Sequence, residues 1–204
     1  MKVKILVACE FSGVVREAFR KRGHDAWSCD LLPSDIPSPY HIQDDVLKHL
    51  DEGWDMMIAH PPCTWLCQAM RTNAARKDRP NITPIYIKER NNAFSFVLKL
   101  WNAPIEKIAL ENPIGYLNQS DVFGKPTQII RPWMFGHPYR KDVCLWLKNL
   151  PNLIPTKIVD GRQKLDYWST KRNPGGKSLK SITYQGIADA MAEQWGSSDC
   201  FEND

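Results

Sequence analysis

The sequence predicts an α/β fold in which a mostly parallel central sheet is flanked by helices. Five short apolar runs of strand length alternate with amphipathic helical patterns along the chain. The runs at 55–59 and 107–110 are apolar almost throughout, as expected for parallel strands that helices cover on both faces. Strands that alternate with helices in this way are typical of parallel sheets with crossover connections.

The first half of the chain contains three of the predicted strands and one helix. In order, we expect a strand (3–8), a helix (14–19), a strand (26–29), a proline-rich loop (32–39) and a strand (55–59). Gly23 follows the helix at a position typical of glycine after a helix C-terminus. The second strand ends at Asp30, and Pro61 with Pro62 terminates the third, because proline cannot continue a sheet ladder.

The second half continues the same alternation. We expect a long helix (85–101), a buried strand (107–110), a late strand (143–147) and a terminal helix (182–195). A length of 204 residues suits one compact domain, so residues 1–204 are predicted to form a single domain. The least regular part is a short basic segment, 148–181.

Composition excludes several classes of protein. With 43% hydrophobic and 25% charged residues, the chain is neither collagen-like, coiled-coil nor wholly disordered. It has no apolar run of about 20 residues and no small-residue cleavage site near the N-terminus, so we expect no membrane span, no signal peptide and a cytoplasmic location. The six cysteines include no CxxC pair and the five histidines show no ligand spacing, so we expect neither disulfides nor a metal.

Positive charge is concentrated in two segments. Residues 157–180 contain seven basic and two acidic residues, and residues 71–90 contain six basic and two acidic residues. Lysine and arginine gathered in this way favour a polyanionic partner such as nucleic acid. The alternative is that both segments are ordinary solvated loops.

The unusual residue clusters all follow predicted strands. These clusters are 9–13, Asp30, 60–63 and 111–113. Ligands of α/β sheets bind beyond the carboxyl ends of the strands, so we expect the clusters to converge on one edge.

His60-Pro61-Pro62-Cys63 and Glu111-Asn112-Pro113 carry the most chemistry. Two prolines fix the backbone before Cys63, which makes its thiol a candidate nucleophile. A glutamic acid nearby can protonate a ring nitrogen of a heterocycle while sulfur adds to the ring. Taken singly, Cys63 could be an idle loop cysteine and Asn112 a helix cap.

These motifs resemble those of the DNA cytosine-5 methyltransferases. That family carries a Pro-Pro-Cys nucleophile motif and, one strand later, a Glu-Asn motif, in the order found here. Residues 135–141 (FGHPYRK) resemble its Tyr-Gly-x-Pro-Gln-x-Arg motif, and 184–195 resemble the C-terminal helix that closes the cofactor pocket. The strings AHPPCT, ENP, CLWLK and GIA-AMAEQWG are similar in particular to a compact phage-encoded branch. The resemblance implies a Rossmann-like S-adenosylmethionine-dependent methyltransferase fold.

The resemblance also implies the roles of individual residues. Cys63 would add to C6 of cytosine and Glu111 would hold the protonated N3 and the exocyclic amine. The remaining catalytic candidates are Pro62, Asn112, Arg140 and Lys141. The candidates for binding S-adenosylmethionine are Cys9, Glu10, Phe11, Ser12, Gly13, Asp30, Leu31, Asp45, Val46, His60 and Pro61. Glu10 and Ser12 stand where the family usually has glycines, Val143 replaces a second arginine, and Asp44 and Asp45 could instead be helix caps.

The implied partner is cytosine-containing DNA, in a bacterial cytoplasm if the chain is phage-encoded. Residues 148–181 replace the family's larger target-recognition domain, so we expect short sequence specificity or a protein partner that supplies it, and otherwise a monomer. An N-methyltransferase is disfavoured by His60 and Cys63. Three alternatives stay open: C5-alkylation of RNA or a free pyrimidine nucleotide, an acidic donor analogue bound through Lys177 or Lys180, and an inactive DNA- or cofactor-binding decoy.

Overall fold

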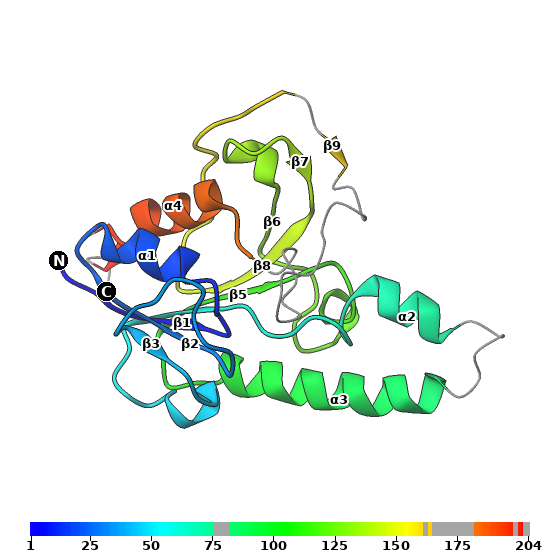
Figure 1. Ribbon diagram of the computed structural model, residues 1–204. Helices are drawn as coiled ribbons and strands as arrows, with labels where there is room; N and C mark the ends of the chain where they lie inside the picture. The colour runs from blue at the N-terminus through cyan, green and yellow to red at the C-terminus, as the bar shows by residue number, and fades with distance from the viewer. Residues whose placement is uncertain (76–81, 161–162, 165–181, 198–199, 202–204) are drawn as a thin grey trace.

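The computed structural model describes residues 1–75, 82–160, 163–164, 182–197 and 200–201. Their main feature is a seven-stranded sheet with the order β3-β2-β1-β4-β5-β8-β6 (Figure 1). Its strands are β1 (Lys4–Ala8), β2 (Asp25–Cys29), β3 (His41–Ile42), β4 (Met56–Ala59), β5 (Lys107–Asn112), β6 (Gln128–Ile130) and β8 (Val143–Lys148). A separate pair contains β7 (Tyr139–Arg140) and β9 (Gln163–Lys164).

The three predicted helices are present, and each begins or ends one to three residues away from its predicted bounds. The helices are α1 (Val14–Arg20), α2 (Gln68–Ala74), α3 (Ile82–Trp101) and α4 (Gln185–Gln194), with 3₁₀ turns η1 (Val46–Lys48), η2 (Leu117–Gln119) and η3 (Pro132–Met134). None of the helices in the described ranges is both long enough and apolar enough to cross a membrane.

The predicted fold class is confirmed. β3, β2, β1, β4 and β5 are all parallel, in the order of the first strands of a Rossmann sheet. β8 runs antiparallel to both β5 and β6, so the late strand is the exception to the parallel sheet. The prediction of β5 was two residues too short. The elements β3, β6 and α2 were not predicted, because β3 and β6 have two and three residues and α2 has seven, too few for a clear periodic signal.

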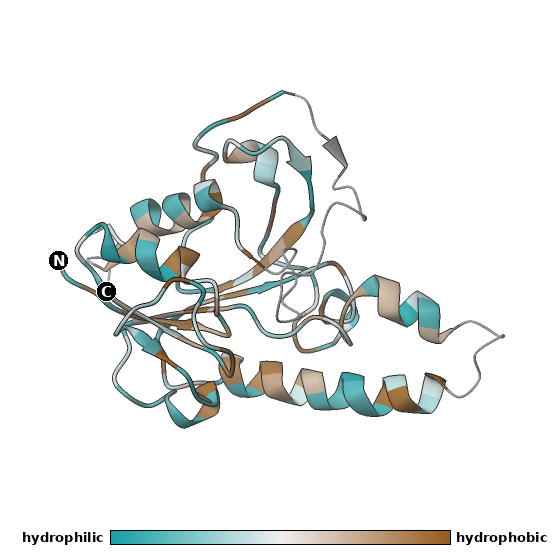
Figure 2. Cartoon of the chain, in the orientation of Figure 1, coloured by the Kyte–Doolittle hydropathy of each residue, from teal (hydrophilic) through white to brown (hydrophobic). Residues whose placement is uncertain are grey.

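Alternate residues of the central strands face opposite layers of helices, as the pleat of a strand requires. Ile5, Val7, Met56, Ile58 and Ala109 pack with α1 and α4 on one face. Leu6, Ala8, Met57, Ala59 and Ile108 pack on the other face with the C-terminal end of α3. Figure 1 shows α1 and α4 side by side across the sheet from α3, and Figure 2 shows brown and teal residues alternating along α3.

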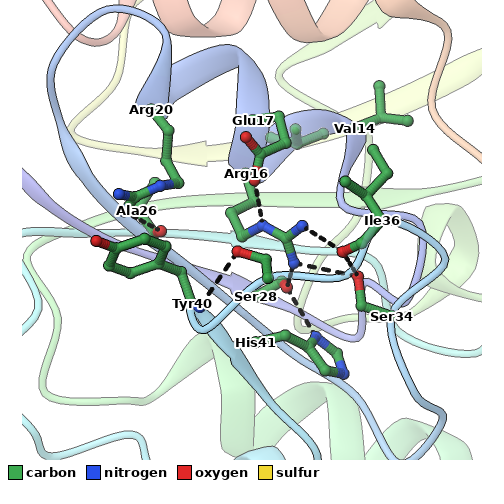
Figure 3. Close-up of polar contacts among 12 residues, drawn as sticks. Val14, Arg16, Glu17, Arg20, Ala26, Ser28, Ser34, Ile36, Tyr40 and His41 are labelled. Carbon is green, nitrogen blue, oxygen red and sulfur yellow. Dashed lines mark hydrogen bonds and ion pairs between the residues drawn. The ribbon is translucent and has the colours of Figure 1, made fainter.

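Arg16 of α1 is fully buried and ties the 31–40 loop to the sheet. Its guanidinium donates hydrogen bonds to Ser28 Oγ (2.7 Å), Ser34 Oγ (3.2 Å) and the Ile36 carbonyl (3.0 Å), and its Nε pairs with Glu17 at 2.8 Å (Figure 3). A buried charge is tolerated only with such a full set of partners. This network therefore holds the loop that follows Asp30 over the start of α1, where a Cβ on Gly13 would lie 2.5 Å from the guanidinium.

We expect Arg16→Met to lower the free energy of unfolding by at least about 2 kcal/mol, because several buried hydrogen bonds to a charged group are lost together. Lys21→Met, at an exposed position after the same helix, is the matched control and should stay within about 0.5 kcal/mol of wild type. Urea unfolding of the three proteins measures the difference. Equal midpoints for both variants would contradict a stabilising role of the network.

Candidate active site

His60 and Glu111 lie side by side at the carboxyl edge of the sheet. Ala59 of β4 pairs with Leu110 of β5, so the next residue of each strand continues the same parallel register. Both side chains fall on the face that packs against α4, and His60 Nδ1 lies 3.2 Å from Glu111 Oε2. The side chains are 8% and 21% exposed, respectively. The register of two strands thus builds a largely buried imidazole–carboxylate pair.

Glu111 is held as a carboxylate despite its burial. Burial alone would raise its pKa, but the hydrogen bond with His60 and the positive charge of Lys141 outweigh it, and the net pKa is lowered. A carboxylate can only accept a hydrogen bond, so the His60 Nδ1–H donates. The other nitrogen, Nε2, is buried and has no hydrogen-bond partner among the residues that the structure describes.

The loop that carries Cys63 is joined to the segment after Glu111. Residues 63–67 form one helical turn, in which the Leu66 and Cys67 N–H groups donate to the Cys63 carbonyl. Across the gap, Tyr116 N donates to the Leu66 carbonyl at 2.7 Å and Gln68 N donates to the Ile114 carbonyl at 3.2 Å. These backbone bonds fix the position of the Cys63 turn relative to the end of β5.

Pro61, Pro62 and Asn112 complete this junction. Asn112 is buried, and its Nδ2 donates to the Pro61 carbonyl at 3.4 Å, whereas Pro62 is exposed. Asn112 lies on the α3 face of β5, opposite to Glu111, because successive strand residues alternate. The structure therefore assigns Asn112 a contact with the loop backbone.

Cys63 reaches solvent, and its surroundings raise the pKa of its thiol. Protein atoms around the sulfur desolvate it, which raises the thiol pKa, and the negative charge of Glu111 raises it further. Cys67 has a smaller effect in the same direction, and Lys141 opposes them all. The thiol, the carboxylate and the ammonium are thus electrostatically coupled at one edge of the sheet.

A cavity opens beside this group and is closed by the start of α4. His60, Glu111, Lys141 and Val143 line its sheet side, and Ile182, Thr183, Tyr184, Ile187 and Met191 line the helix side. Gly186 N donates to His137 Nε2 at 3.0 Å, which anchors α4 to the loop before β7. Sequence reasoning expected the terminal helix to close a pocket, but it did not identify the residues on the helix side.

Most residues predicted to bind a cofactor lie at the ends of β1, β2 and β3, whereas His60 and Pro61 follow β4. Asp30 and Asp45 both lie close enough to Cys9 for their charges to raise the pKa of its thiol, although burial is the larger cause. Val46 is buried and Leu31 is 73% exposed. Asp45 Oδ1 accepts from Leu47 N at 3.0 Å as the N-cap of η1, so the capping alternative describes this carboxylate correctly.

Glu10 and Ser12 have an internal role. The buried Glu10 carboxylate accepts hydrogen bonds from Val15 N (2.7 Å), Arg16 N (3.2 Å) and Ser12 Oγ (3.2 Å). It therefore satisfies N–H groups in the first turn of α1, which otherwise lack a partner. Burial raises the pKa of Glu10, and the charge of nearby His60 is the largest opposing effect. Phe11 is buried beside it, and its carbonyl accepts from Asp35 N.

Arg140 lies apart from Lys141. Arg140 and Asp142 line a second hollow with Arg131 and Trp133, whereas Lys141 and Val143 line the first cavity. Alternation along an extended segment accounts for this separation. Arg131 Nε pairs with Asp142 at 2.6 Å.

Several predicted features lie outside the described residues. They are Lys177, Lys180, most of the basic segment 148–181 and part of the basic segment 71–90. Within the described ranges, no three His, Cys, Asp or Glu side chains are grouped in a way that could hold a metal ion.

Comparison with known proteins gives only distant likenesses. No protein-family model and no curated protein matches the sequence. Among solved structures, the chain is similar to a candidate DNA modification methyltransferase encoded within an E. coli prophage (14% identity, TM-score 0.49, 78% of this chain and 52% of that chain). It is also similar to the S. pombe Dnmt2 methyltransferase (14% identity, TM-score 0.46, 80% and 52%). The aligned region spans about half the length of each.

We expect Gly115→Ala to displace the Cys63 turn. A Cβ at this position would collide with the Leu66 carbonyl oxygen and lie 2.9 Å from Cys67 Cα, and backbone atoms cannot move aside easily. Overpacking of this kind costs about 1–3 kcal/mol. Urea unfolding and the alkylation rate of Cys63 should both change. Gly53→Ala, where the added Cβ meets nothing, is the control and should leave Cys63 reactivity at the wild-type rate.

Substitution of the charged neighbours should move the reactivity of Cys63 in opposite directions. Glu111→Gln removes a negative charge that raises the thiol pKa, so iodoacetamide should alkylate Cys63 roughly three- to tenfold faster at pH 7.5. Lys141→Met should slow alkylation, because Lys141 lowers the thiol pKa. Mass spectrometry of the labelled peptide measures both rates, with Cys67 as an internal reference. Identical rates in all three proteins would show that these charges do not reach the thiol.

Proposed function

We propose that this protein is an S-adenosylmethionine-dependent DNA methyltransferase that modifies C5 of cytosine. The observation that carries the proposal is the meeting of Cys63, Glu111 and Lys141 at the carboxyl edge of the sheet. A nucleophile and an acid–base group held together by two neighbouring strands suit addition to an electron-poor ring. The order of the motifs and their resemblance to the cytosine-5 family support the choice of pyrimidine and position.

In this proposal Cys63 supplies the nucleophile. Its thiolate adds to C6 of cytosine while Glu111 protonates N3, which makes C5 nucleophilic. After C5 has been alkylated, its proton passes to a water molecule, the C5–C6 double bond re-forms, and the C6–S bond breaks so that the Cys63 thiolate leaves. Burial is the main cause of the raised thiol pKa and the charge of Glu111 is the next, so a proton on Glu111 would lower the thiol pKa.

The residues around the ends of β1 and β2 fit S-adenosylmethionine. When bound, it supplies the electrophilic methyl group. Asp30 and Asp45 bring two carboxylates close to Cys9, and carboxylates at the end of the second strand accept ribose hydroxyls in dinucleotide folds. Because Glu10 already occupies the first turn of α1, we do not expect the donor's own carboxylate to bind there.

Cytosine in duplex DNA is the proposed substrate. The target base must leave the stack before it can reach Cys63, at a cost of a few kcal/mol. Arg140 and Arg131, in the second hollow, are candidates for phosphate contacts next to the base. Such contacts position a strand without reading its sequence, in line with short or partner-assisted specificity.

Covalent trapping tests the proposal. The protein is incubated with S-adenosylmethionine and duplex DNA that contains 5-fluorocytosine, and adducts that survive denaturation are counted on a gel. Fluorine at C5 cannot be eliminated as a proton is, so the enzyme should remain attached. Wild type should form the adduct, Cys63→Ala should form none, and Glu111→Gln should form it at least about 100-fold more slowly.

Cys67→Ala is the matched control, because it removes a second thiol four residues away and should leave trapping at the wild-type level. Parallel reactions contain 5-fluorocytosine in single-stranded DNA, in RNA and as a free nucleotide. Trapping on one of these but not on duplex DNA would redirect the substrate. No adduct on any of them, or an equal adduct with Cys63→Ala, would refute the proposed mechanism.

A further inference from the structure

The second hollow differs from the first cavity in its chemistry. It has a volume of about 360 Å³, which lies in the range of small-molecule sites in proteins. Its lining consists of two arginines, one tryptophan and one aspartate, namely Arg131, Trp133, Arg140 and Asp142. Guanidinium groups bind phosphates and base edges, and aromatic rings stack on bases. This set of side chains therefore matches a nucleotide.

The loop that carries Trp133 is fixed by backbone hydrogen bonds. Trp133 lies in η3, and its carbonyl accepts from Val159 N at 3.0 Å. In the same loop, Lys157 N donates to the Met134 carbonyl at 3.1 Å, and the Lys157 carbonyl accepts from Gly136 N at 2.7 Å. These bonds hold the Trp133 backbone at a defined place on the wall of the hollow.

Arg131 is oriented by Asp142. Arg131 Nε donates to Asp142 Oδ1 at 2.6 Å, and the two side chains are 40% and 38% exposed, respectively. The Arg131 side chain makes no other hydrogen bond to the residues that the structure describes. An arginine held through Nε presents both terminal Nη groups to a ligand, in a planar fork that matches two neighbouring acceptors.

Arg140 places the second hollow close to the first cavity. It is exposed on β7, and the next residue, Lys141, lines the first cavity instead. Consecutive residues of an extended segment point to opposite sides, and their Cα atoms are only about 3.8 Å apart. A DNA strand whose target base enters the first cavity therefore passes the second hollow within a few nucleotides.

We propose that the second hollow binds a guanine that lies near the target cytosine in the same DNA strand, an inference that rests on the proposed function. Guanine presents two acceptors side by side, O6 and N7, and bidentate contact of arginine with this pair is the commonest specific contact in protein–DNA complexes. Arg131 donates to these two acceptors, Trp133 stacks on the ring, and Arg140 pairs with a phosphate. Like the target base, this guanine leaves the base stack to enter its site.

The presence of Asp142 favours base readout over a site for phosphate alone. A carboxylate repels phosphate, so a site that only attracted the DNA backbone would be stronger without it. Asp142 instead fixes the direction of the Arg131 fork, and a fixed fork distinguishes guanine from the other bases.

Binding of short single strands without cytosine tests the site separately from the reaction. Labelled d(TTGTT) and d(TTATT) are titrated by fluorescence anisotropy at one fixed salt concentration, because phosphate contacts depend on salt. Wild type should bind d(TTGTT) roughly tenfold more tightly than d(TTATT). Trp133→Leu should weaken the binding of both strands by roughly fivefold or more, because stacking does not depend on the base.

Two variants separate base readout from general attraction. Arg131→Lys keeps the charge but lacks the fork, so it should bind d(TTATT) like wild type and lose the preference for guanine. Asp142→Asn should strengthen the binding of both strands and also lose most of the preference. If Arg131→Lys fails to fold by circular dichroism, Arg131→Gln replaces it, and the ratio of the two affinities is compared.

The matched controls are Arg140→Met and Lys21→Met. Arg140→Met should weaken both strands by the same factor, because phosphate contacts carry no sequence information. Lys21 is exposed and lines neither the first cavity nor the second hollow, so Lys21→Met should bind both strands like wild type.

Trapping then locates the guanine relative to the target. A single guanine is moved through about three nucleotides on each side of 5-fluorocytosine, in a strand that is otherwise thymine, because each strand of B-DNA advances about 3.4 Å per nucleotide. Adduct formation by wild type should be roughly tenfold faster with guanine at one of these positions. In Arg131→Lys the rate should no longer depend on the position of guanine.

The outcomes separate the inference from the proposed function. A preference for guanine that requires Arg131 and Asp142, together with trapping that depends on the position of guanine, supports both. Equal binding of the two strands, a preference that Arg131→Lys leaves unchanged, or trapping that ignores guanine at every position overturns the inference and leaves the proposed function standing. If guanine is preferred but no adduct forms on any substrate, the proposed function is wrong, and the hollow loses its role in selecting the target.

Discussion

The parallel register of β4 and β5 is the constraint on which the candidate site depends. It continues past Ala59 and Leu110, so that His60 and Glu111 are neighbours on one face of the sheet. Neither side chain could be buried alone, because an isolated carboxylate or imidazole would lose its hydration without compensation. The hydrogen bond between them gives each side chain one partner, so the pair can be buried between the strands and α4.

The polar groups at this edge of the sheet are of two kinds, which differ in their roles. Arg16 and Glu10 have structural roles, Arg16 in the network under the 31–40 loop and Glu10 as acceptor for the first turn of α1. His60 and Lys141 instead line the cavity, and Cys63 is exposed at the start of its turn. Residues of the first kind make the edge rigid, and residues of the second kind are what the edge presents to a ligand.

Backbone contacts attach the Cys63 turn to the segment that follows β5. Backbone hydrogen bonds join it to residues 114–116, and the approach is so close that only glycine fits at 115. These contacts fix where the thiol lies, while burial and the charge of Glu111 raise its pKa.

The sequence by itself determined the parallel sheet, its principal strands, and the convergence of the clusters after β1, β2, β4 and β5. Apolar runs bounded by glycine and proline are local signals, and the rule that ligands lie at carboxyl strand ends needs no coordinates. The residues that meet at that edge were also named from the sequence. The partners of these residues could not be named from the sequence, because contacts across the sheet depend on the strand register and on the face that each residue occupies.

Only the tertiary structure decided those partners. It turned Glu10 inward to cap α1, paired His60 with Glu111, separated Arg140 from Lys141, and set the direction of β8. In each case the deciding factor is a buried polar group that must find a donor or acceptor, or a pleat that sends neighbouring residues to opposite faces. The pairing of His60 and Glu111 joins residues 51 positions apart, and no local pattern in the sequence records it.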